Sequence, residues 1–410
     1  MKLTKEQEVL LNLISLSISD NPSALVLSRE ELSDVNFVTV AKESIYQAVN
    51  MQAFSSAVSH YKEFISQPII NKWQEFAVNS TQSNLKVIKA QNDLVKILEG
   101  GGYSYAIIKG ASASSYYNAP FERILGDVDF LIDKEKKEEL ENLLLSNGYQ
   151  KDPMAHISHV VFTKPDAHLE MHFEVAGLPE NEYKSYVQNF VLPTVESAVV
   201  NNVDGNKFLS PNHLYHGAII LLHTQHHMLN EGLGLRHLCD LAVFVSKTHK
   251  EDFWVKELLP FAKNIGLYKF LSVMVKTCVK YLKIPRPDWL EDFTEPSPEE
   301  IILDVFSSGN MGKKDEVRAR SGMLIAKKGN KKRGAIATLA VSLHKAVILK
   351  YPFVKKWWIL YPFIYLYKAI QNVFRMIFGK RTSISKMAPE AKKRQSLYDK
   401  LDVYKTKENK

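Results

Sequence analysis

The stretch RILGDVDFLID, residues 123–133, sets two carboxylates inside a run that is otherwise typical of a buried strand. Side chains alternate between the two faces of a strand, so Asp127 and Asp129 are expected on one face while Val128 and Phe130 enter the core. Neighbouring carboxylates repel each other unless a cation lies between them, and such oxygen ligands suit Mg²⁺. A D-x-D pattern alone also occurs on solvated strands, so the surrounding residues decide between the two interpretations.

Short apolar segments on both sides of this pair predict a small mixed sheet. Strands are expected at residues 103–108, 127–132, 158–163 and 168–175, with helices between them. This pattern predicts an α+β fold whose sheet is embedded between N-terminal and C-terminal helical regions. Glu170 and His172 share a strand face, which offers a third carboxylate. The first strand runs into Lys109-Gly110-Ala111-Ser112, where a helix N-terminus can present N–H groups to an anion.

The string IIKGASASSYYNAPFERILGDVDFLI, followed by LEMHF, resembles the uncharacterised nucleotidyltransferase family of the polymerase-β superfamily. That superfamily carries a strand-to-helix turn with a glycine, then D-x-D on a strand, then a third acidic residue on a later strand. The nearer family adds a lysine before the glycine, an arginine before the acidic pair and a histidine after the third acidic residue. The matching residues are Lys109, Gly110, Arg123, Asp127, Asp129, Glu170 and His172.

The resemblance implies a metal-dependent enzyme that moves an NMP from an NTP to an acceptor hydroxyl or phosphate and releases pyrophosphate. Asp127, Asp129 and Glu170 are then expected to be catalytic and to bind two Mg²⁺ ions, or Mn²⁺ in their place. The residues expected to contact the nucleotide are Lys109, Gly110, Ser112 and Arg123. For Lys109 and Arg123, an ion pair with a nearby carboxylate is an equal expectation. The acceptor stays open among a sugar or lipid intermediate, a protein, an RNA and a small molecule.

Six of the 13 histidines fall between residues 213 and 237. His223 and His227 have the i, i+4 spacing of many zinc ligands, but Thr224 stands where the H-E-x-x-H motif of metalloproteases has glutamate. Arg236 and Asp240 are also four apart and are expected to pair in a pocket wall. Packing between helices is the alternative for the histidines. The residues expected around the pocket are His172, His223, His227, Arg236 and Asp240.

Charge is unevenly distributed along the chain. Residues 311–410 contain 25 Lys and Arg against 6 Asp and Glu, whereas the preceding residues are net acidic. This asymmetry favours contact with phosphate-rich material, with a solvated tail as the alternative. The predicted regions are an N-terminal helical region (1–100), a nucleotidyltransferase α+β core (101–205), a helical domain completing the cleft (206–310) and a basic C-terminal region with an amphipathic helix and a disordered tail (311–410).

Residues 357–378, WWILYPFIYLYKAIQNVFRMIF, are apolar, but Pro362, Lys368 and Arg375 interrupt them too soon for a membrane span. An amphipathic helix here fits either a membrane interface or the body of the protein. Only two cysteines occur, which favours a reducing compartment. The expected location is cytoplasmic, with peripheral contact on the inner face of the membrane as an addition.

Two other functional interpretations stay open at this stage. One is a catalytically silent relative that binds a nucleotide or a partner, against which the three intact carboxylates argue. The other is a membrane- or nucleic-acid-associated interaction protein whose sheet is only a scaffold. The basic C-terminal region supports it, although no RNA-binding aromatic motif or helix-turn-helix signature accompanies that charge.

Overall fold

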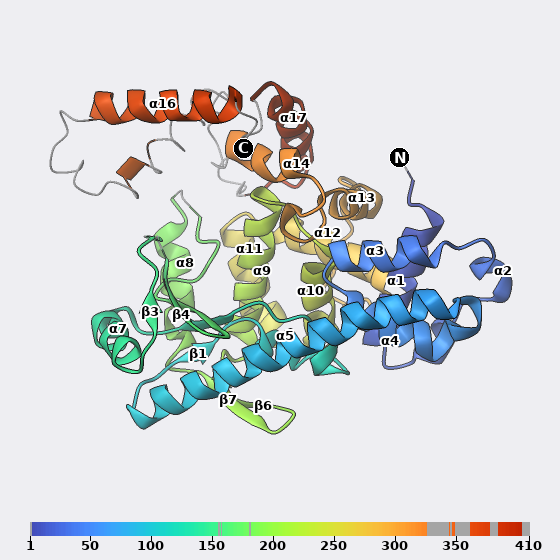
Figure 1. Cartoon of the computed structure of the whole chain (residues 1–410), viewed down its shortest axis with the longest axis horizontal. Coiled ribbons are helices and arrows are strands. Elements are labelled where there is room, and N and C mark those ends of the chain that lie inside the picture. Colours follow the sequence, from blue (N-terminus) through green and yellow to red (C-terminus); the bar gives the residue numbers. More distant parts are fainter. Residues whose placement is uncertain are drawn as a thin grey trace.

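The computed structural model of the chain describes residues 2–154, 156, 158–179, 182–325, 344, 347–348, 361–377 and 384–403. Within them a small mixed sheet lies among many helices, so the predicted α+β fold is confirmed. Figure 1 shows the N-terminal helices at one end of the molecule and the sheet at the other, with the long helix α5 running between them.

The N-terminal region is helical because apolar residues recur at helical spacing and polar residues cap the helix starts. Thr4 and Gln7 form a capping box before α1, whose buried face includes Leu10 and Ile14. Helix α5 has 34 residues and ends in a run of glycines, of which Gly102 has φ 70°. The helices are α1 (Lys5–Ile18), α2 (Arg29–Leu32), α3 (Phe37–Tyr46), α4 (Asn50–Tyr61) and α5 (Gln67–Gly100).

The five-stranded sheet has the order β1-β2-β5-β4-β3. Strands β2 and β5 are parallel, and the other neighbouring pairs are antiparallel. In the parallel pair, Asp129 lies beside Glu170. The elements are β1 (Ala106–Ile107), α6 (Ala111–Ser114), β2 (Val128–Leu131), α7 (Lys137–Ser146), β3 (Gln150–Lys151), β4 (His159–Lys164) and β5 (Ala167–His172).

The two faces of this sheet differ in chemistry. Phe130 and Met171 enter a core that is closed by the second half of α5 and by α7, which contribute Leu94 and Leu140. The opposite face carries the carboxylates of β2 and β5. Strand alternation therefore separates the apolar and acidic side chains as the sequence predicted.

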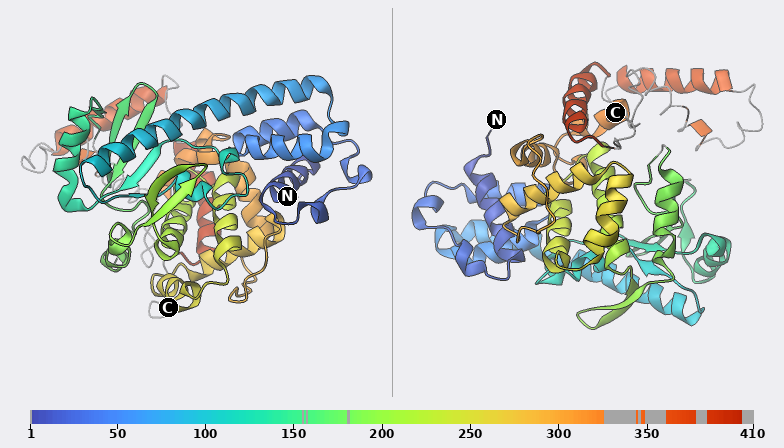
Figure 2. Two further views of the ribbon diagram at one scale, coloured as in Figure 1. Left: turned by 90° about the horizontal axis from the view of Figure 1, so that it is seen from below. Right: turned by 180° about the vertical axis from the view of Figure 1, so that it is seen from behind.

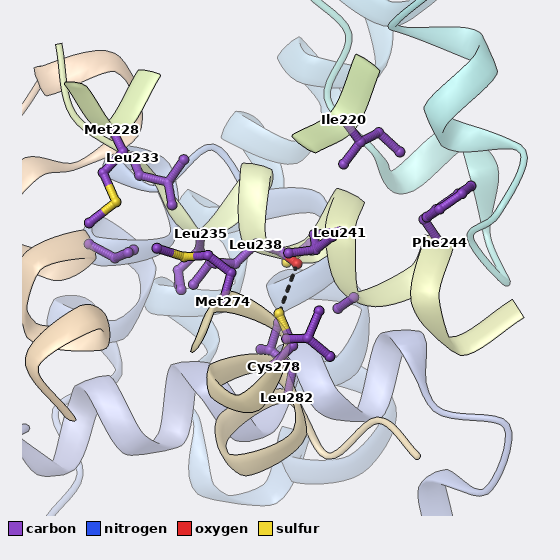
Figure 3. Close-up of a cluster of buried hydrophobic side chains, with 14 of the residues drawn as sticks. Ile220, Met228, Leu233, Leu235, Leu238, Leu241, Phe244, Met274, Cys278 and Leu282 are labelled. Carbon is purple, nitrogen blue, oxygen red and sulfur yellow. Dashed lines mark hydrogen bonds between the residues drawn. The ribbon is translucent and has the colours of Figure 1, made fainter. Parts of the chain in front are cut away.

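A larger core unites the helices that follow the sheet with α1, α3 and α4. Figure 2 shows the ribbons of these helices from two further sides. Figure 3 shows part of it, where Leu238 and Met274 pack together and Cys278 Sγ donates a hydrogen bond of 3.5 Å to the Leu238 carbonyl. Because residues from 1–100 and 206–310 share this core, those two predicted regions pack as one body. The helices are α8 (Lys184–Val191), α9 (His213–Leu229), α10 (Leu235–Thr248), α11 (Leu259–Asn264), α12 (Tyr268–Leu282) and α13 (Pro298–Ser308), with a π-helical turn at Trp254–Leu258.

A β-hairpin that the sequence reading missed lies between α8 and α9. It consists of β6 (Val199–Val203) and β7 (Asn206–Ser210). Its turn has positive φ at both Asp204 and Gly205. This geometry matches the twist of a two-residue hairpin, for which Asp-Gly is a favoured sequence.

The C-terminal region contains α14 (Glu316–Ser321), α16 (Tyr361–Ile377) and α17 (Ile384–Lys400). The expectation of a disordered tail is wrong for α17, because its side chains Met387, Arg394 and Tyr398 are buried against the body. Residues 404–410 of that tail, and 357–360 and 378 of the expected amphipathic segment, lie outside the described residues. In the described part of the chain, no helix combines the length and the apolar character needed to cross a membrane.

Candidate active site

A cavity of about 840 Å³ lies against the acidic face of the sheet. Its wall is formed by the turn after β1, the loop before β2, strands β2, β4 and β5, and helices α9 and α10. This volume is typical of sites for small molecules. Every predicted site residue lines the cavity except Ser112.

The three predicted catalytic carboxylates come from two neighbouring parallel strands. Asp129 and Glu170 are register partners on β2 and β5, and Asp127 directly precedes β2. Asp127 and Glu170, together with His168, offer ligand atoms that lie within 4.8 Å of one another. His168 was not among the predicted site residues, although strand alternation places its side chain on the same face as Glu170.

Asp129 has two cationic neighbours of its own. Its Oδ1 lies 2.5 Å from Lys109 Nζ and 2.9 Å from His172 Nε2, which is also 3.3 Å from Glu170 Oε2. Burial opposes ionisation of Asp129, but Lys109 and His172 outweigh it and lower the pKa of this carboxyl. The ion pair expected for Lys109 is therefore present in this structure.

Among the described residues Asp127 forms no ion pair with a cation, and its pKa shifts in the opposite direction. Burial, reinforced by the negative charges of Asp129 and Glu170, raises the pKa of Asp127 to about 7. The cluster is therefore short of positive charge at Asp127. A divalent cation held by carboxylate oxygens would supply it, so the residues fit the expected metal.

The glycine turn lines the cavity as predicted, whereas Ser112 does not. Gly110 lines the cavity with φ 55° and ψ −111°, a conformation that side chains disfavour. Ser112 is fully buried and donates its hydroxyl to the Ile107 carbonyl, while its amide donates to the Lys109 carbonyl. The expectation that Ser112 contacts phosphate is therefore wrong for this structure.

The structure differs from the prediction in which of two arginines pairs with Asp240. Arg123 is 5% exposed and binds Asp240 through Nε and an Nη atom, both at 2.7 Å. Tyr117 donates to the same carboxylate at 2.7 Å. The predicted Arg236–Asp240 pair is thus replaced, and Arg236 donates instead to the Ile124 carbonyl at 3.4 Å. Burial and the charge of Arg123 lower the pKa of Arg236.

Asn84, from the middle of α5, holds the loop that leads to the carboxylates. Its Nδ2 donates to the carbonyls of Phe121 and Arg123, both at 2.9 Å, and its Oδ1 accepts from the Leu125 amide at 2.8 Å. Asn84 is 1% exposed, so these bonds are made away from water. Asn84 is one of four asparagines on α5, and nothing in the sequence distinguishes it for this role.

Histidines line two sides of the cavity. On the sheet, His159 stacks on His156 with ring centroids 4.3 Å apart, and burial lowers the pKa of His159 to about 4. On the helices, the predicted pair His223 and His227 is joined by His237. Burial lowers the pKa of both His223 and His237 well below the usual value, so these imidazoles are neutral.

The family model described as an uncharacterised nucleotidyltransferase matches residues 34–283. The chain belongs to this uncharacterised nucleotidyltransferase family. The match includes the glycine turn, the three carboxylates and the histidine-bearing helices, and it confirms the resemblance inferred from the sequence.

Comparisons beyond the family model add little. None of the curated proteins matches the chain. The crystal structure of an antigenic nucleotidyltransferase-like protein from Paracoccidioides brasiliensis is similar over 47% of this chain and 92% of its own, with 16% identity and a TM-score of 0.30. At this TM-score the likeness carries no structural argument.

Proposed function

We propose that this member of the nucleotidyltransferase family is a divalent-metal-dependent enzyme that transfers NMP from an NTP to an acceptor hydroxyl or phosphate. Pyrophosphate is the leaving group. The observation that carries the proposal is the in-register pairing of Asp129 with Glu170, with Asp127 and the Gly110 turn facing the same cavity. Family membership by itself supports nucleotidyl transfer only in general terms.

Asp127 and Glu170 would hold Mg²⁺ or Mn²⁺. Asp129 would become a further ligand once its carboxylate exchanges its contacts with Lys109 and His172 for the ion. When bound, the ions supply Lewis-acid stabilisation of the phosphate charge. Glu170, whose side chain is 21% exposed, is the carboxylate placed to accept a proton from an acceptor hydroxyl. His172 bridges Asp129 and Glu170 and keeps both carboxylates in position.

Lys109 and Arg236 are the cations proposed to balance the triphosphate. Lys109 reaches the cavity beside the Gly110 turn, so it can exchange Asp129 for a phosphate oxygen. Arg236 also lines the cavity, and its Nε has no hydrogen-bond partner among the described residues. Arg123 is the weaker candidate because Asp240 already neutralises it.

The decisive variant is Asp129→Asn, compared with Asp133→Asn, an exposed aspartate just after the same strand. Wild type is expected to release pyrophosphate and to label an acceptor in cell extract when given labelled NTP and Mg²⁺ or Mn²⁺. Asp129→Asn should lower this rate at least about 100-fold. Loss of a residue that hydrogen-bonds to a metal ligand costs about 10–100-fold, and loss of the ligand itself should cost more. Asp133→Asn should retain it.

Binding is measured separately because the acceptor is unidentified. Each NTP with Mg²⁺ is titrated while the melting temperature of the purified protein is followed. At least one NTP should raise the melting temperature of wild type, and Asp129→Asn should respond less. A wild type that responds to no nucleotide would contradict the proposal and favour a silent relative.

We further propose that α16 contacts an anionic membrane surface from the cytoplasmic side. Phe363, Leu366, Tyr367 and Ile370 lie at helical spacing and are 68%, 60%, 55% and 47% exposed. An exposed apolar face on a region with 25 Lys and Arg against 6 Asp and Glu matches the chemistry of a negatively charged bilayer.

Flotation with vesicles tests this contact. Wild type is expected to float with vesicles containing anionic lipid and to stay behind with purely zwitterionic ones. Replacing Phe363, Leu366 and Ile370 by serine should abolish flotation without changing nucleotide binding. Flotation that is unchanged in this triple variant would rule out α16 as the contact.

A further inference from the structure

Three histidines meet on the helical side of the cavity, away from the carboxylates of the sheet. His223 and His227 lie one turn apart on α9, and His237 lies near the start of α10. The Nε2 atoms of His223 and His227 are 2.9 Å apart. One ring nitrogen from each of the three residues falls within 4.8 Å of the others.

The group is buried, and part of it is unpaired. His237 is 2% exposed and His227 is 8% exposed. His237 Nε2 has no hydrogen-bond partner among the described residues, nor does His227 Nδ1. Buried polar atoms normally find partners, so two orphaned ring nitrogens in one cluster require an explanation. A bound cation would provide one for His237.

A carboxylate stands behind one of the rings. Glu231 Oε2 lies 3.5 Å from His227 Nδ1, on the opposite side of the ring from the contact with His223. In metal sites a ligating histidine commonly has such a carboxylate behind it, which fixes the tautomer and strengthens the ligand. His227 therefore has the surroundings of a metal ligand.

We propose that His223, His227 and His237 bind one transition-metal ion of the Zn²⁺ class. Imidazole nitrogens suit such ions, whereas Mg²⁺ prefers the oxygen ligands across the cavity. All three histidines line the cavity that also contains Asp127 and Glu170. An ion held by three protein ligands would keep a further position for water or for an oxygen of a bound acceptor.

Binding requires two local adjustments, and both are small. Ligation through Nε2 places the proton of His237 on Nδ1, which removes the contact that Nδ1 accepts from the Gly234 amide at 3.4 Å. That contact is already long for a hydrogen bond. The Nε2 atoms of His223 and His227 must also separate from 2.9 Å. The separation around tetrahedral zinc is about 3.3 Å for bonds of about 2.05 Å.

The competing explanation is a hydrogen bond between His223 and His227 with no ion. Full-length, untagged protein is stripped with a chelator, and Co²⁺ binding is followed by its visible absorption. Wild type is expected to bind one equivalent of Co²⁺ tightly in a nitrogen-rich site of low coordination number, in addition to any weaker binding by the carboxylates. The His223→Ala/His237→Ala variant should bind at least about 100-fold more weakly.

Two controls locate the ion. His213→Ala removes an exposed histidine from the same helix and should leave Co²⁺ binding unchanged. Asp127→Asn/Glu170→Gln removes two carboxylates and should also leave it unchanged. Equal binding by wild type and the histidine double variant, or loss of binding in the carboxylate variant, would overturn the proposal.

X-ray absorption on zinc-loaded wild type covers the case in which the histidine double variant does not fold. Three imidazole nitrogens at about 2.0–2.1 Å are expected, and a shell made mainly of oxygen would overturn the assignment. These experiments contain no nucleotide and no Mg²⁺. A negative result in them would therefore not contradict NMP transfer by the carboxylates. Equally, absence of NMP transfer would not contradict metal binding by the histidines.

Discussion

At the scale of single residues, the candidate site is organised by an unequal sharing of positive charge. Asp129 has Lys109 and His172 within hydrogen-bond distance, whereas Asp127 is held near other carboxylates. Two aspartates only two residues apart therefore differ, since Asp129 on β2 stays ionised and Asp127 just before β2 readily takes up a proton. The difference of surroundings gives the two aspartates different tasks despite their identical chemistry.

The pKa of Asp127 predicts how stability depends on pH without metal. Its folded pKa is about 7, against an ordinary value of 3.8, so the folded state keeps a proton that the unfolded chain releases. This contribution is full below the ordinary pKa and is lost as pH rises towards the folded pKa. The free energy of unfolding of wild type, relative to Asp127→Asn, should therefore fall between about pH 4 and pH 7.

Urea unfolding at a series of pH values, in EDTA and in saturating Mg²⁺, measures this dependence. Mg²⁺ replaces the proton, so it should flatten the difference between wild type and Asp127→Asn. A difference that is flat in EDTA would show that Asp127 ionises normally, and its assigned surroundings would then be incorrect.

The Arg123–Asp240 pair predicts a large effect on stability. Arg123→Ala leaves the Asp240 carboxylate buried with Tyr117 as its remaining donor, which should lower the free energy of unfolding by about 3–5 kcal/mol. Arg123→Lys keeps the charge but loses the two-pronged contact, so its effect should be smaller. Equilibrium urea unfolding gives both values, and a change below about 1 kcal/mol in Arg123→Ala would contradict a structural role.

At the scale of elements, the turn between β1 and α6 depends on Gly110. Because φ and ψ lie in a region that is nearly specific to glycine, Gly110→Ala should lower the free energy of unfolding by about 1–3 kcal/mol and reduce nucleotide affinity. A Cβ on Gly110 would meet the Asp127 carbonyl only at 3.5 Å, so the penalty is conformational rather than steric.

Gly126→Ala is the matched control. This glycine lies in the same cavity wall, has no positive φ, and a Cβ there would meet nothing within 4 Å. Its effect should stay within about 0.5 kcal/mol. Equal effects of the two substitutions on unfolding and on nucleotide affinity would show that the turn conformation does not matter.

Local periodicity made several elements predictable from the sequence. Alternation placed Asp129 and Glu170 on one strand face and Phe130 and Met171 on the other, as the structure has them. The β6–β7 hairpin was missed even though Asp204-Gly205 is a strong turn signal. In α17, the buried residues recur at intervals of four and three, but the many lysines between them hid that pattern. The residues of this series are Met387, Ala391, Arg394 and Tyr398, with Leu401 just after the helix, and Leu397 is buried as well.

Contacts between distant parts of the chain could not be read from the sequence. Arg236 and Asp240 have the spacing of a helical ion pair, yet Asp240 binds Arg123, which lies 117 residues away in the chain. The same holds for Asn84 and the loop it supports. Such choices depend on which elements meet in three dimensions, and a single sequence without its packing does not specify that.

At the scale of the whole molecule, α17 ties the C-terminal region to the histidine-bearing helix. Arg394 is 1% exposed and donates 2.9 Å bonds to the carbonyls of Met228 and Asn230, and a 2.8 Å bond to that of Arg318. Met228 and Asn230 follow His227 directly along the chain. The end of α9 is therefore held by a segment that lies more than 150 residues away in the sequence.

Arg394→Ala should therefore destabilise the fold and loosen the histidine group. The Met228 and Arg318 carbonyls keep bonds from Tyr398 and Ser321, so the cost is that of the lost hydrogen bonds. Each bond from a charged donor contributes about 1.5–3 kcal/mol, and the free energy of unfolding should fall by at least that amount. Hydrogen exchange should become faster in residues 227–231 while the sheet stays protected. Lys392→Ala, on the exposed side of α17, is the control. An equal loss of stability in this variant would show that the Arg394 hydrogen bonds do not hold the end of α9.

Helix α5 belongs to both hydrophobic cores, with Trp73 in one and Leu94 in the other, and Asn84 between them. Dividing the chain into a catalytic fragment and an accessory fragment should therefore destabilise both. A cut before α5 removes α1, α3 and α4 from the larger core. A cut within α5 exposes apolar surface on both fragments. A fluorescent reporter is better inserted at the exposed β6–β7 turn, which leaves this helix whole.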